Sequence, residues 1–107
     1  MRLDLALVKQ WVRAKYTDDW PSLVEDFTAS TRAEPGNISF DWYRSAEDPN
    51  LWVLIELFRD AEAGQVHVES AHFKDASSKM PRWLAAVPEI IHVEVPDGFA
   101  PVSEASS

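Results

Sequence analysis

The segment VHVESAHFKD, residues 66–75, carries two of the chain's three histidines, His67 and His72. An imidazole titrates near neutral pH, so either ring could take a proton from a substrate and later return it. Glu56 stands eleven residues before His67 in the otherwise apolar run LWVLIELF. A carboxylate on an apolar strand face needs a polar partner. We therefore predict that Glu56 pairs with His67 or His72, that the histidine holds the carboxylate ionised, and that His67 is the catalytic base.

The spacing of His67 and His72 constrains how they could act together. At about 100° per residue, the two rings would lie about 140° apart on an unbroken helix. They share a face only if the helix breaks near Ser70-Ala71, so we expect one of them to line the pocket. Neither ring has the i, i+4 histidine partner of a helical metal site, so no metal is expected. The alternative for each histidine is a structural hydrogen bond, and Glu56 could equally pair with an arginine.

The elements that must position these residues follow a β-α-β-β-α-β order. Strands are indicated by β-branched and aromatic runs, helices by apolar residues in helical spacing, and boundaries by Asp, Pro and Gly. This order predicts an α+β, ferredoxin-like protomer with a four-stranded antiparallel sheet and helices on one face. The expected elements are a strand at 3–13, a helix at 18–36, hairpin strands at 37–45 and 51–60, a helix at 61–69 capped by Asp60, a helical piece from Phe73 to Val87 that Pro81 bends or restarts, and a strand at 89–96.

The strand at 51–60 carries apolar side chains on both of its faces. A sheet with one solvated face should alternate apolar and polar residues, and each large side chain left in water forgoes about 1.5–3 kcal/mol. We therefore predict a homodimer joined sheet to sheet; the alternative is that loops and the C-terminal tail cover this face. The row expected beneath the helices is Leu51, Val53, Ile55 and Leu57, and the row expected on the uncovered face is Trp52, Leu54, Glu56 and Phe58.

Length and composition exclude several classes of protein. A chain of 107 residues suits one domain, which we place at 1–98, with a flexible tail at 99–107. Eighteen acidic and ten basic residues give a net charge of −8, which disfavours nucleic acid and anionic membranes as partners. The chain has no cysteine, so thiol chemistry is excluded. No apolar run is long enough to cross a bilayer, and we expect a soluble, unprocessed, cytoplasmic protein.

Several sequence features together resemble a known family. They are EPG at 34–36, Glu56 within IELFRD, His67 eleven residues later, and SAHFK at 70–74. Over residues 3–98 the chain resembles the antibiotic biosynthesis monooxygenase family, which includes small quinol monooxygenases. The resemblance implies a dimeric α/β barrel of ferredoxin-like protomers, each enclosing an apolar pocket. It also implies oxygenation of a small phenolic or quinol-type aromatic by molecular oxygen, without metal, haem or flavin.

Such a reaction sets requirements for the site. A phenol of pKa ~10 exceeds an ordinary histidine by ~3.5 units, so the pocket must also stabilise the phenolate. The expected machinery is His67 as base with Glu56 as its partner, and His72 as the alternative base. His92, on the last strand, is expected at the surface or at an interface. The expected pocket walls are Trp42, Trp52, Phe58 and Phe73, and the possible oxyanion donors are Tyr43 and Arg44.

Two other functions fit the same predicted pocket. A non-catalytic dimeric protein would bind a small hydrophobic metabolite there without turnover. A metabolite isomerase would use the same proton-transfer pair but no oxygen. Because one fold can carry many reactions, the predicted architecture does not choose among the three.

Overall fold

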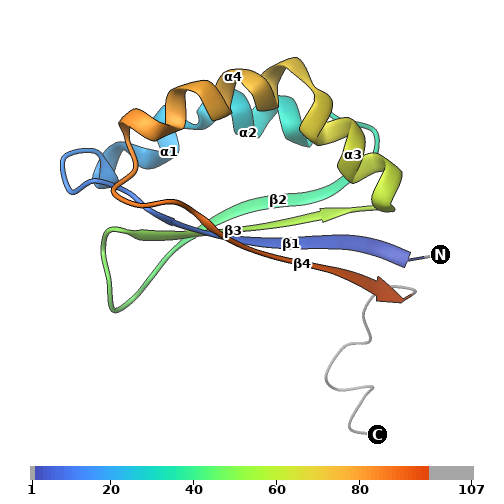
Figure 1. Cartoon of the computed structure of the whole chain (residues 1–107), viewed down its shortest axis with the longest axis horizontal. Coiled ribbons are helices and arrows are strands. Elements are labelled where there is room, and N and C mark those ends of the chain that lie inside the picture. The colour runs from blue at the N-terminus through green and yellow to red at the C-terminus, as the bar shows by residue number, and fades with distance from the viewer. Residues whose placement is uncertain (1, 97–107) are drawn as a thin grey trace, which may run out of the picture.

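The computed structural model describes residues 2–96, and its elements follow the expected order (Figure 1). The flexible tail expected at 99–107 lies outside the described residues. Across residues 2–96, none of the helices has the length and apolar character needed to span a bilayer. The elements are β1 (Arg2–Trp11), η1 (Thr17–Asp19), α1 (Trp20–Leu23), α2 (Glu25–Arg32), β2 (Asn37–Arg44), β3 (Leu51–Phe58), α3 (Ala61–Glu69), α4 (Ala71–Lys79), η2 (Met80–Arg82) and β4 (Glu89–Pro96), where η marks a short 3-10 helix.

The four strands form one antiparallel sheet in the order β2-β3-β1-β4. All the helices lie over one face of this sheet (Figure 1). This is the ferredoxin-like arrangement that the order of elements predicts. In the register, Ala6 of β1 stands opposite Glu56 of β3 on one side and His92 of β4 on the other. Residues directly opposite each other share a sheet face, so these three side chains form one row.

The second helical region breaks where the sequence indicates. Asp60 caps α3, because its Oδ1 accepts a 2.8 Å hydrogen bond from the backbone N–H of Ala63. Ser70 has extended backbone angles, φ −71° and ψ 155°, and separates α3 from α4. Its hydroxyl donates to the His67 carbonyl at 2.6 Å and accepts from the Phe73 N–H at 3.2 Å. One serine therefore ends the first helix and begins the second.

The first helical region departs from the single helix expected at 18–36. A 3-10 turn precedes α1, and Val24 leaves helical geometry with φ −104° and ψ 12°, so that α2 begins as a separate helix at Glu25. Neither helix start has a side-chain cap. In the last helical region, α4 ends at Lys79 and η2 contains Pro81, so the expected restart at this proline is confirmed.

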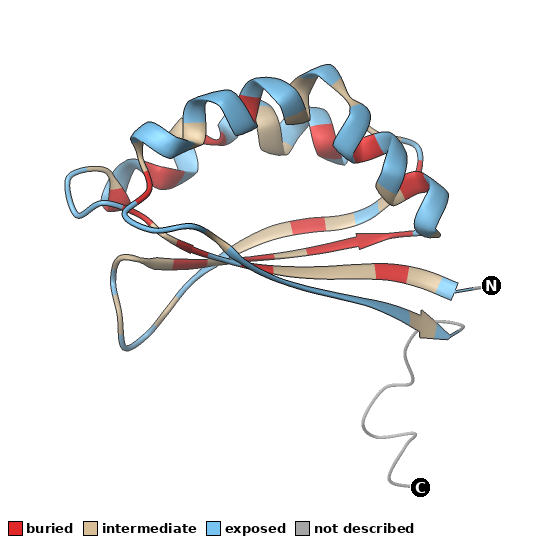
Figure 2. Ribbon diagram, viewed as in Figure 1, coloured by how far each residue is buried: buried red, intermediate tan, exposed pale blue. Residues whose placement is uncertain are grey.

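Buried apolar residues form two clusters, and Figure 2 shows buried residues on both the sheet and the helices. The first surrounds Trp20, which is fully buried and meets Trp42 and Trp83 edge to face at centroid distances of 5.6 and 6.1 Å. Such aromatic contacts add to the free energy of area burial. The second surrounds Phe40, with Val8, Leu54 and Phe27. These clusters fix the helices at the α1 and α2 end of the sheet.

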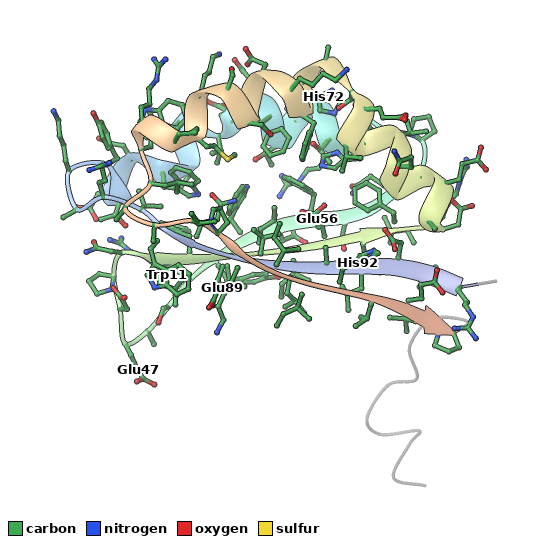
Figure 3. The ribbon with its side chains drawn as sticks, in the orientation of Figure 1. Trp11, Glu47, Glu56, His72, Glu89 and His92 are labelled. Carbon is green, nitrogen blue, oxygen red and sulfur yellow. The ribbon has the colours of Figure 1, made fainter. Side chains whose placement is uncertain are left out.

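The assignment of the two β3 rows to their faces was wrong. Trp52, Leu54, Glu56 and Phe58 are all buried and face the helices, whereas the odd-numbered row lies on the open face, where Leu57 alone of the row is also buried. Figure 3 shows Glu56 directed toward the helices, with Trp11 and Glu89 on the opposite side of the sheet. Alternation fixes which residues share a face, but two apolar rows do not reveal which one the helices cover. The carboxylate in the even row marks the inner face, because its histidine partner comes from α3.

The open face of the sheet is strongly apolar. Leu5, Leu57 and Val93 form one row across three strands, and Leu7, Ile55 and Ile91 form the next. Ile91 is 54% exposed and Val93 is 43% exposed. An exposed apolar surface of this kind on a sheet is a candidate contact surface for another molecule.

Candidate active site

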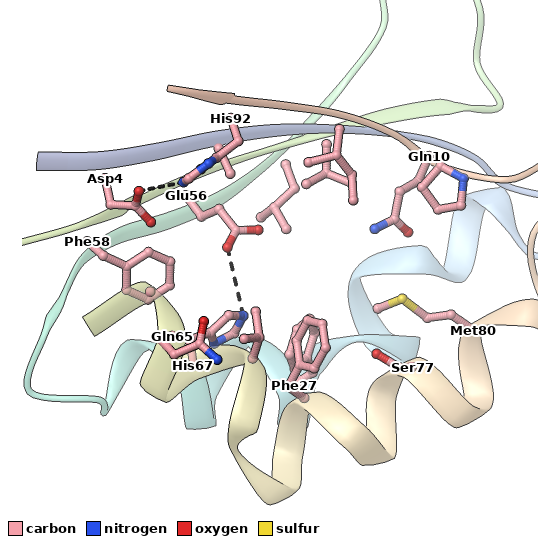
Figure 4. Close-up of a pocket in the computed structure, with 18 of the residues that line it drawn as sticks. Asp4, Gln10, Phe27, Glu56, Phe58, Gln65, His67, Ser77, Met80 and His92 are labelled. Atoms are coloured by element: carbon pink, nitrogen blue, oxygen red, sulfur yellow. Dashed lines mark hydrogen bonds and ion pairs between the residues drawn. The ribbon is translucent and has the colours of Figure 1, made fainter. Parts of the chain in front are cut away.

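A cavity of about 500 Å³ lies between the sheet and the helices of a single protomer (Figure 4). Inner-face side chains of β1, β3 and β4 form one wall, and side chains of α2, α3 and α4 form the other. The volume and the mainly apolar lining, with a few polar groups, are those of a small-molecule site. His67 and Glu56 both line this cavity. The reversed face assignment had implied that a second copy encloses Glu56, but the cavity around Glu56 lies within one protomer.

Glu34, just after α2, binds both histidines of the segment 66–75, His67 and His72. Its Oε2 lies 2.9 Å from His67 Nδ1 and 2.5 Å from His72 Nε2. An ionised carboxylate only accepts hydrogen bonds, so both ring nitrogens are assigned as N–H donors. In the neutral His67 ring the proton therefore sits on Nδ1, and Nε2 carries a free lone pair. His67 and His72 thus act on one carboxylate, but only His67 lines the cavity.

Local sequence brings these three residues together. The break at Ser70 turns α4 relative to α3, so residues five apart reach the same acceptor. Gly36, two residues after Glu34, lets α3 approach closely, because a Cβ there would meet the Cβ of Ala63 at 2.4 Å. Sequence analysis missed Glu34, since EPG was interpreted only as a helix stop and as one feature of the family resemblance. The usable signal was an acidic residue directly before that stop.

His67 is almost fully buried, at 1% exposure. Burial lowers its pKa below 6.5, although the hydrogen bond and charge of Glu34 act in the opposite direction. Within residues 2–96, no protein group hydrogen-bonds its Nε2. Phe27 stacks on the ring at a centroid distance of 5.8 Å and Phe73 meets it edge-on at 5.2 Å. The ring is therefore a neutral base that offers its lone pair to the cavity.

Glu56 lies close to that lone pair. Its Oε1 lies 3.8 Å from His67 Nε2, beyond hydrogen-bond distance, and its side chain is 12% exposed. Burial raises its pKa to about 7, with further raising by the carboxylates of Asp4 and Glu34 and opposition from His92. The expectation that a histidine holds Glu56 ionised is therefore wrong. The raised pKa favours the protonated form of Glu56 up to near neutral pH.

Asp4 and His92 form a second carboxylate–imidazole pair on the cavity wall. Asp4 is buried, His92 is exposed, and His92 Nε2 lies 2.5 Å from Asp4 Oδ1 (Figure 4). Gly64 of α3 packs against this pair, because a Cβ there would lie 2.3 Å from Asp4 Oδ2. His92 is at the surface as expected, but it also lines the cavity. Sequence analysis missed Asp4, whose signal was a charge inside the strand RLDLALV.

Two of the four expected aromatic wall residues line the cavity. They are Phe58 and Phe73. Trp42 and Trp52 instead lie at the α1 and α2 end, where their indole N–H groups donate to hydroxyls of Thr28 and Thr17. They border a separate hollow beside α2. Both tryptophans support the core rather than the cavity wall.

Neither expected oxyanion donor reaches the cavity. Tyr43 is 53% exposed and lies on the open face of the sheet. The Arg44 guanidinium binds the Asp18 carboxylate at 2.7 Å and the Pro49 carbonyl at 2.7 Å. Both residues lie at the end of β2 that is distant from His67. Their positions in the sequence did not reveal this distance.

Glu34, His67 and His72 are also the residues that could hold a metal ion. Their ligand atoms all lie within 4.8 Å of one another. The expectation of no metal rested on i, i+4 spacing, and this trio assembles without that spacing. Both imidazoles, however, already donate to Glu34 Oε2, so a metal would have to replace two hydrogen bonds. The described arrangement is that of a carboxylate that orients two histidines.

Comparison with known proteins identifies the family of this chain. Residues 5–79 match the family described as antibiotic biosynthesis monooxygenase. The chain belongs to this family. The matched range of the antibiotic biosynthesis monooxygenase family includes Glu34, Glu56, His67 and His72.

Individual relatives extend the comparison. The Bacillus subtilis (strain 168) protein named "Putative monooxygenase YcnE" is 30% identical over 88 residues, which cover 82% of this chain and 88% of that protein. The solved structure of a "Putative antibiotic biosynthesis monooxygenase" from Nitrosomonas europaea superposes with a TM-score of 0.83 at 22% identity, covering 92% and 94% of the two chains. That of Rv0793 from Mycobacterium tuberculosis gives 0.82 at 22% identity, covering 92% and 99%. These two structural matches establish the shared fold.

Proposed function

We propose that this member of the antibiotic biosynthesis monooxygenase family oxygenates a small phenolic or quinol-type aromatic with molecular oxygen and no bound cofactor. The observation that supports the proposal is the buried, unpartnered Nε2 of His67, which opens into an apolar cavity beside Glu56. An unpaired buried polar atom in a ligand-sized cavity favours a substrate contact over a purely structural role.

His67 is the base in this proposal. The substrate hydroxyl donates to Nε2 and transfers its proton there, while Glu34 accepts from Nδ1–H and stabilises the imidazolium that forms. A carboxylate behind the ring raises the affinity of Nε2 for the incoming proton and fixes the ring orientation. The base is thus prepared before substrate binds.

Glu56 supplies the stabilisation that a histidine alone lacks. An oxygen atom placed between His67 Nε2 and Glu56 Oε1, which are 3.8 Å apart, can lie within hydrogen-bond distance of both. Protonated Glu56 then donates to the developing phenolate. Its pKa of about 7 keeps this proton available at neutral pH. Glu56 takes the oxyanion role that the sequence had assigned to Tyr43 or Arg44.

The electrons come from the substrate itself. The phenolate gives one electron to oxygen, and the resulting radical pair joins at a ring carbon ortho or para to the hydroxyl. The peroxide receives the proton held by His67, the ring carbon loses its hydrogen, and the O–O bond breaks as water leaves. The ring C–H thus becomes C=O, and substrate plus oxygen gives a quinone-type product plus water. The chain's own residues only bind the substrate and move protons.

The dimer belongs to the same proposal. The open sheet face carries rows of aliphatic side chains, with Ile91 and Val93 about half exposed. A second copy placed sheet to sheet would remove these side chains from water, at about 25 cal/mol per Å² of apolar area. The cavity lies on the other face of the sheet, so each protomer would keep its own site.

Oxygen uptake tests the proposed activity. Metal-stripped protein should consume oxygen with naphthols or hydroquinones and release the quinone that carries the added oxygen atom, a naphthoquinone from a naphthol or a hydroxyquinone from a hydroquinone, and His67→Ala should abolish most of the uptake. Lys74→Ala, an exposed change on α4, is the control. Unchanged uptake in His67→Ala would contradict the proposal. Product formed under nitrogen would instead favour an isomerase that uses the same His67 and Glu56 pair.

A further inference from the structure

Gln10 is a polar side chain that the proposed chemistry does not use. It lies on β1, is only 4% exposed, and lines the same cavity as His67. Among the described residues no group hydrogen-bonds its Oε1, and that atom is buried. Buried side-chain amides in folded proteins almost always have partners, so an unpaired one calls for a specific explanation.

The position of Gln10 gives the cavity a second polar end. Ala6 stands opposite Glu56, and Gln10 follows four residues later on the same face of β1, about 14 Å along the strand. Between the two ends the wall is apolar, with Val8 and Leu54. Figure 4 shows Gln10 beside Met80 at one end, and Glu56 with His67 at the other. A molecule that fills this space is elongated.

In the described part of the chain, none of the polar groups around Gln10 bonds its Oε1, including the Ser77 hydroxyl, which lines the same cavity near Met80 (Figure 4). Its strand neighbour across the sheet is Trp52, whose indole N–H is already bonded to the Thr17 hydroxyl. Met80 and Pro88, which also line this end of the cavity, bring no hydrogen-bonding side-chain group apart from a weakly accepting thioether. An apolar side chain of the same length at position 10 would leave no unpaired atom. The amide is therefore suited to a ligand rather than to the fold.

We infer that Gln10 binds a second polar group at the far end of the substrate. The ligand class is then a fused bicyclic or tricyclic aromatic with hydroxyl groups at opposite ends. One hydroxyl meets His67 and Glu56, and the other meets the Gln10 amide, which can both accept and donate a hydrogen bond. The inference rests on the proposed function for the position of the first hydroxyl. It assigns Gln10 as a residue that determines substrate specificity.

Binding of matched probes to the full chain tests the inference. The pairs are 2,6-dihydroxynaphthalene with 2-naphthol, and 2,6-dihydroxyanthracene with 2-hydroxyanthracene. We expect the dihydroxy member of at least one pair to bind about 10-fold or more tightly than its partner, measured by titration calorimetry under nitrogen. In Gln10→Leu and in Gln10→Met this ratio should fall to about one. Phenol and hydroquinone, which are too short to span both ends, should show no effect of Gln10.

Thermal unfolding without ligand separates a ligand role from a structural one. Removing an unpaired buried amide should raise the unfolding midpoint of Gln10→Leu or Gln10→Met, whereas loss of a structural hydrogen bond would lower it. A lower midpoint in both variants, or an unchanged binding ratio, would overturn the inference.

Failure of the inference can be distinguished from failure of the proposed function. Oxygen uptake that depends on His67 while Gln10→Leu keeps the wild-type binding ratio would leave the oxygenase and remove the role of Gln10. If the binding ratio falls to about one in Gln10→Leu but the wild type consumes no oxygen, Gln10 remains a ligand contact and the proposed oxygenase activity is rejected.

Discussion

His67 Nδ1 donates a 2.9 Å hydrogen bond to Oε2 of Glu34, which lies 33 positions earlier in the chain. The ring that faces the cavity is thus held from behind by a buried carboxylate. In the proposed mechanism Glu34 does not contact the substrate; it positions His67 and stabilises its protonated form.

Replacing Glu34 by glutamine should therefore affect turnover more than binding. Glu34→Gln removes the charge that stabilises the imidazolium, and we expect kcat to fall about 10- to 100-fold with a small change in KM. Oxygen uptake under saturating substrate is the measurement. Asp41→Asn, the same type of change at an exposed carboxylate that pairs with Arg32, should leave kcat unchanged. An equal fall in both variants would contradict the positioning role.

The raised pKa of Glu56 predicts a specific dependence of stability on pH. Folding shifts its pKa from 4.5 to about 7, so the folded state binds more protons than the unfolded state between these values. The free energy of unfolding must therefore fall as pH rises through this window. Glu56→Gln does not bury an ionisable group at this position. Its free energy of unfolding should therefore exceed that of the wild type by up to ~3 kcal/mol above pH 7, and by little near pH 4.5. Urea unfolding at both pH values measures it, with Glu62→Gln, exposed on α3, as control.

The same two groups predict a bell-shaped pH profile for kcat/KM. Activity requires a neutral His67, whose pKa is below 6.5 because of burial, and a protonated Glu56, whose pKa is about 7. The rate should rise at acidic pH and decline above about pH 7. In Glu56→Gln the amide N–H still donates but does not titrate, so the alkaline decline should disappear. Persistence of that decline would exclude Glu56 as its source.

The contact between Gly64 and Asp4 predicts a coupled pair of mutations. In Gly64→Ala the new Cβ would lie 2.3 Å from Asp4 Oδ2, and we expect a loss of about 1–3 kcal/mol of unfolding free energy. In an Asp4→Ala background the clash is absent, and alanine should stabilise α3 by up to about 1 kcal/mol relative to glycine. Chemical denaturation of the four proteins of this double-mutant cycle measures the coupling. If the two mutations change the unfolding free energy additively, Gly64 and Asp4 do not contact each other as the structure describes.

The proposed dimer predicts a mass change on mutation of the open sheet face. Ile91→Lys or Val93→Lys would place a charge in the apolar contact, so light scattering should report a single-chain mass at concentrations where the wild type has twice that mass. Val66→Lys makes the same change at an exposed position on α3 and should keep the wild-type mass. A wild type that stays a monomer at high micromolar concentration would exclude the dimer.

The sequence predicted the architecture well because its signals are local. The strand at 89–96, the Asp60 cap and the break near Ser70 each depend on neighbouring residues, and all three are confirmed. The cost of burying a carboxylate in an apolar strand also singled out Glu56 as a neighbour of His67, and both line one cavity, although the face assigned to Glu56 was reversed. Periodicity, capping residues and the cost of burying a charge were sufficient for these predictions.

The remainder of the site depends on tertiary contacts that no local pattern contains. Glu34 joins the histidines only because the chain just after α2 lies beside the junction of α3 and α4, and Asp4 meets His92 across two neighbouring strands. Tyr43 was misplaced because the face on which an apolar strand meets its helices is decided by the whole molecule. Gln10 stood in the sequence as one polar residue in a strand, and only its burial shows that it lacks a partner.

Ser70 makes the site sensitive to the number of residues between His67 and His72. Its hydroxyl bridges the end of one helix and the start of the next, so it fixes the rotational phase between the segments that carry His67 and His72. One residue inserted after Ser70 would turn the second segment by about 100°. Such an insertion would swing His72 away from Glu34 while leaving His67 in place. The interval between the two rings should therefore tolerate substitutions far better than insertions or deletions.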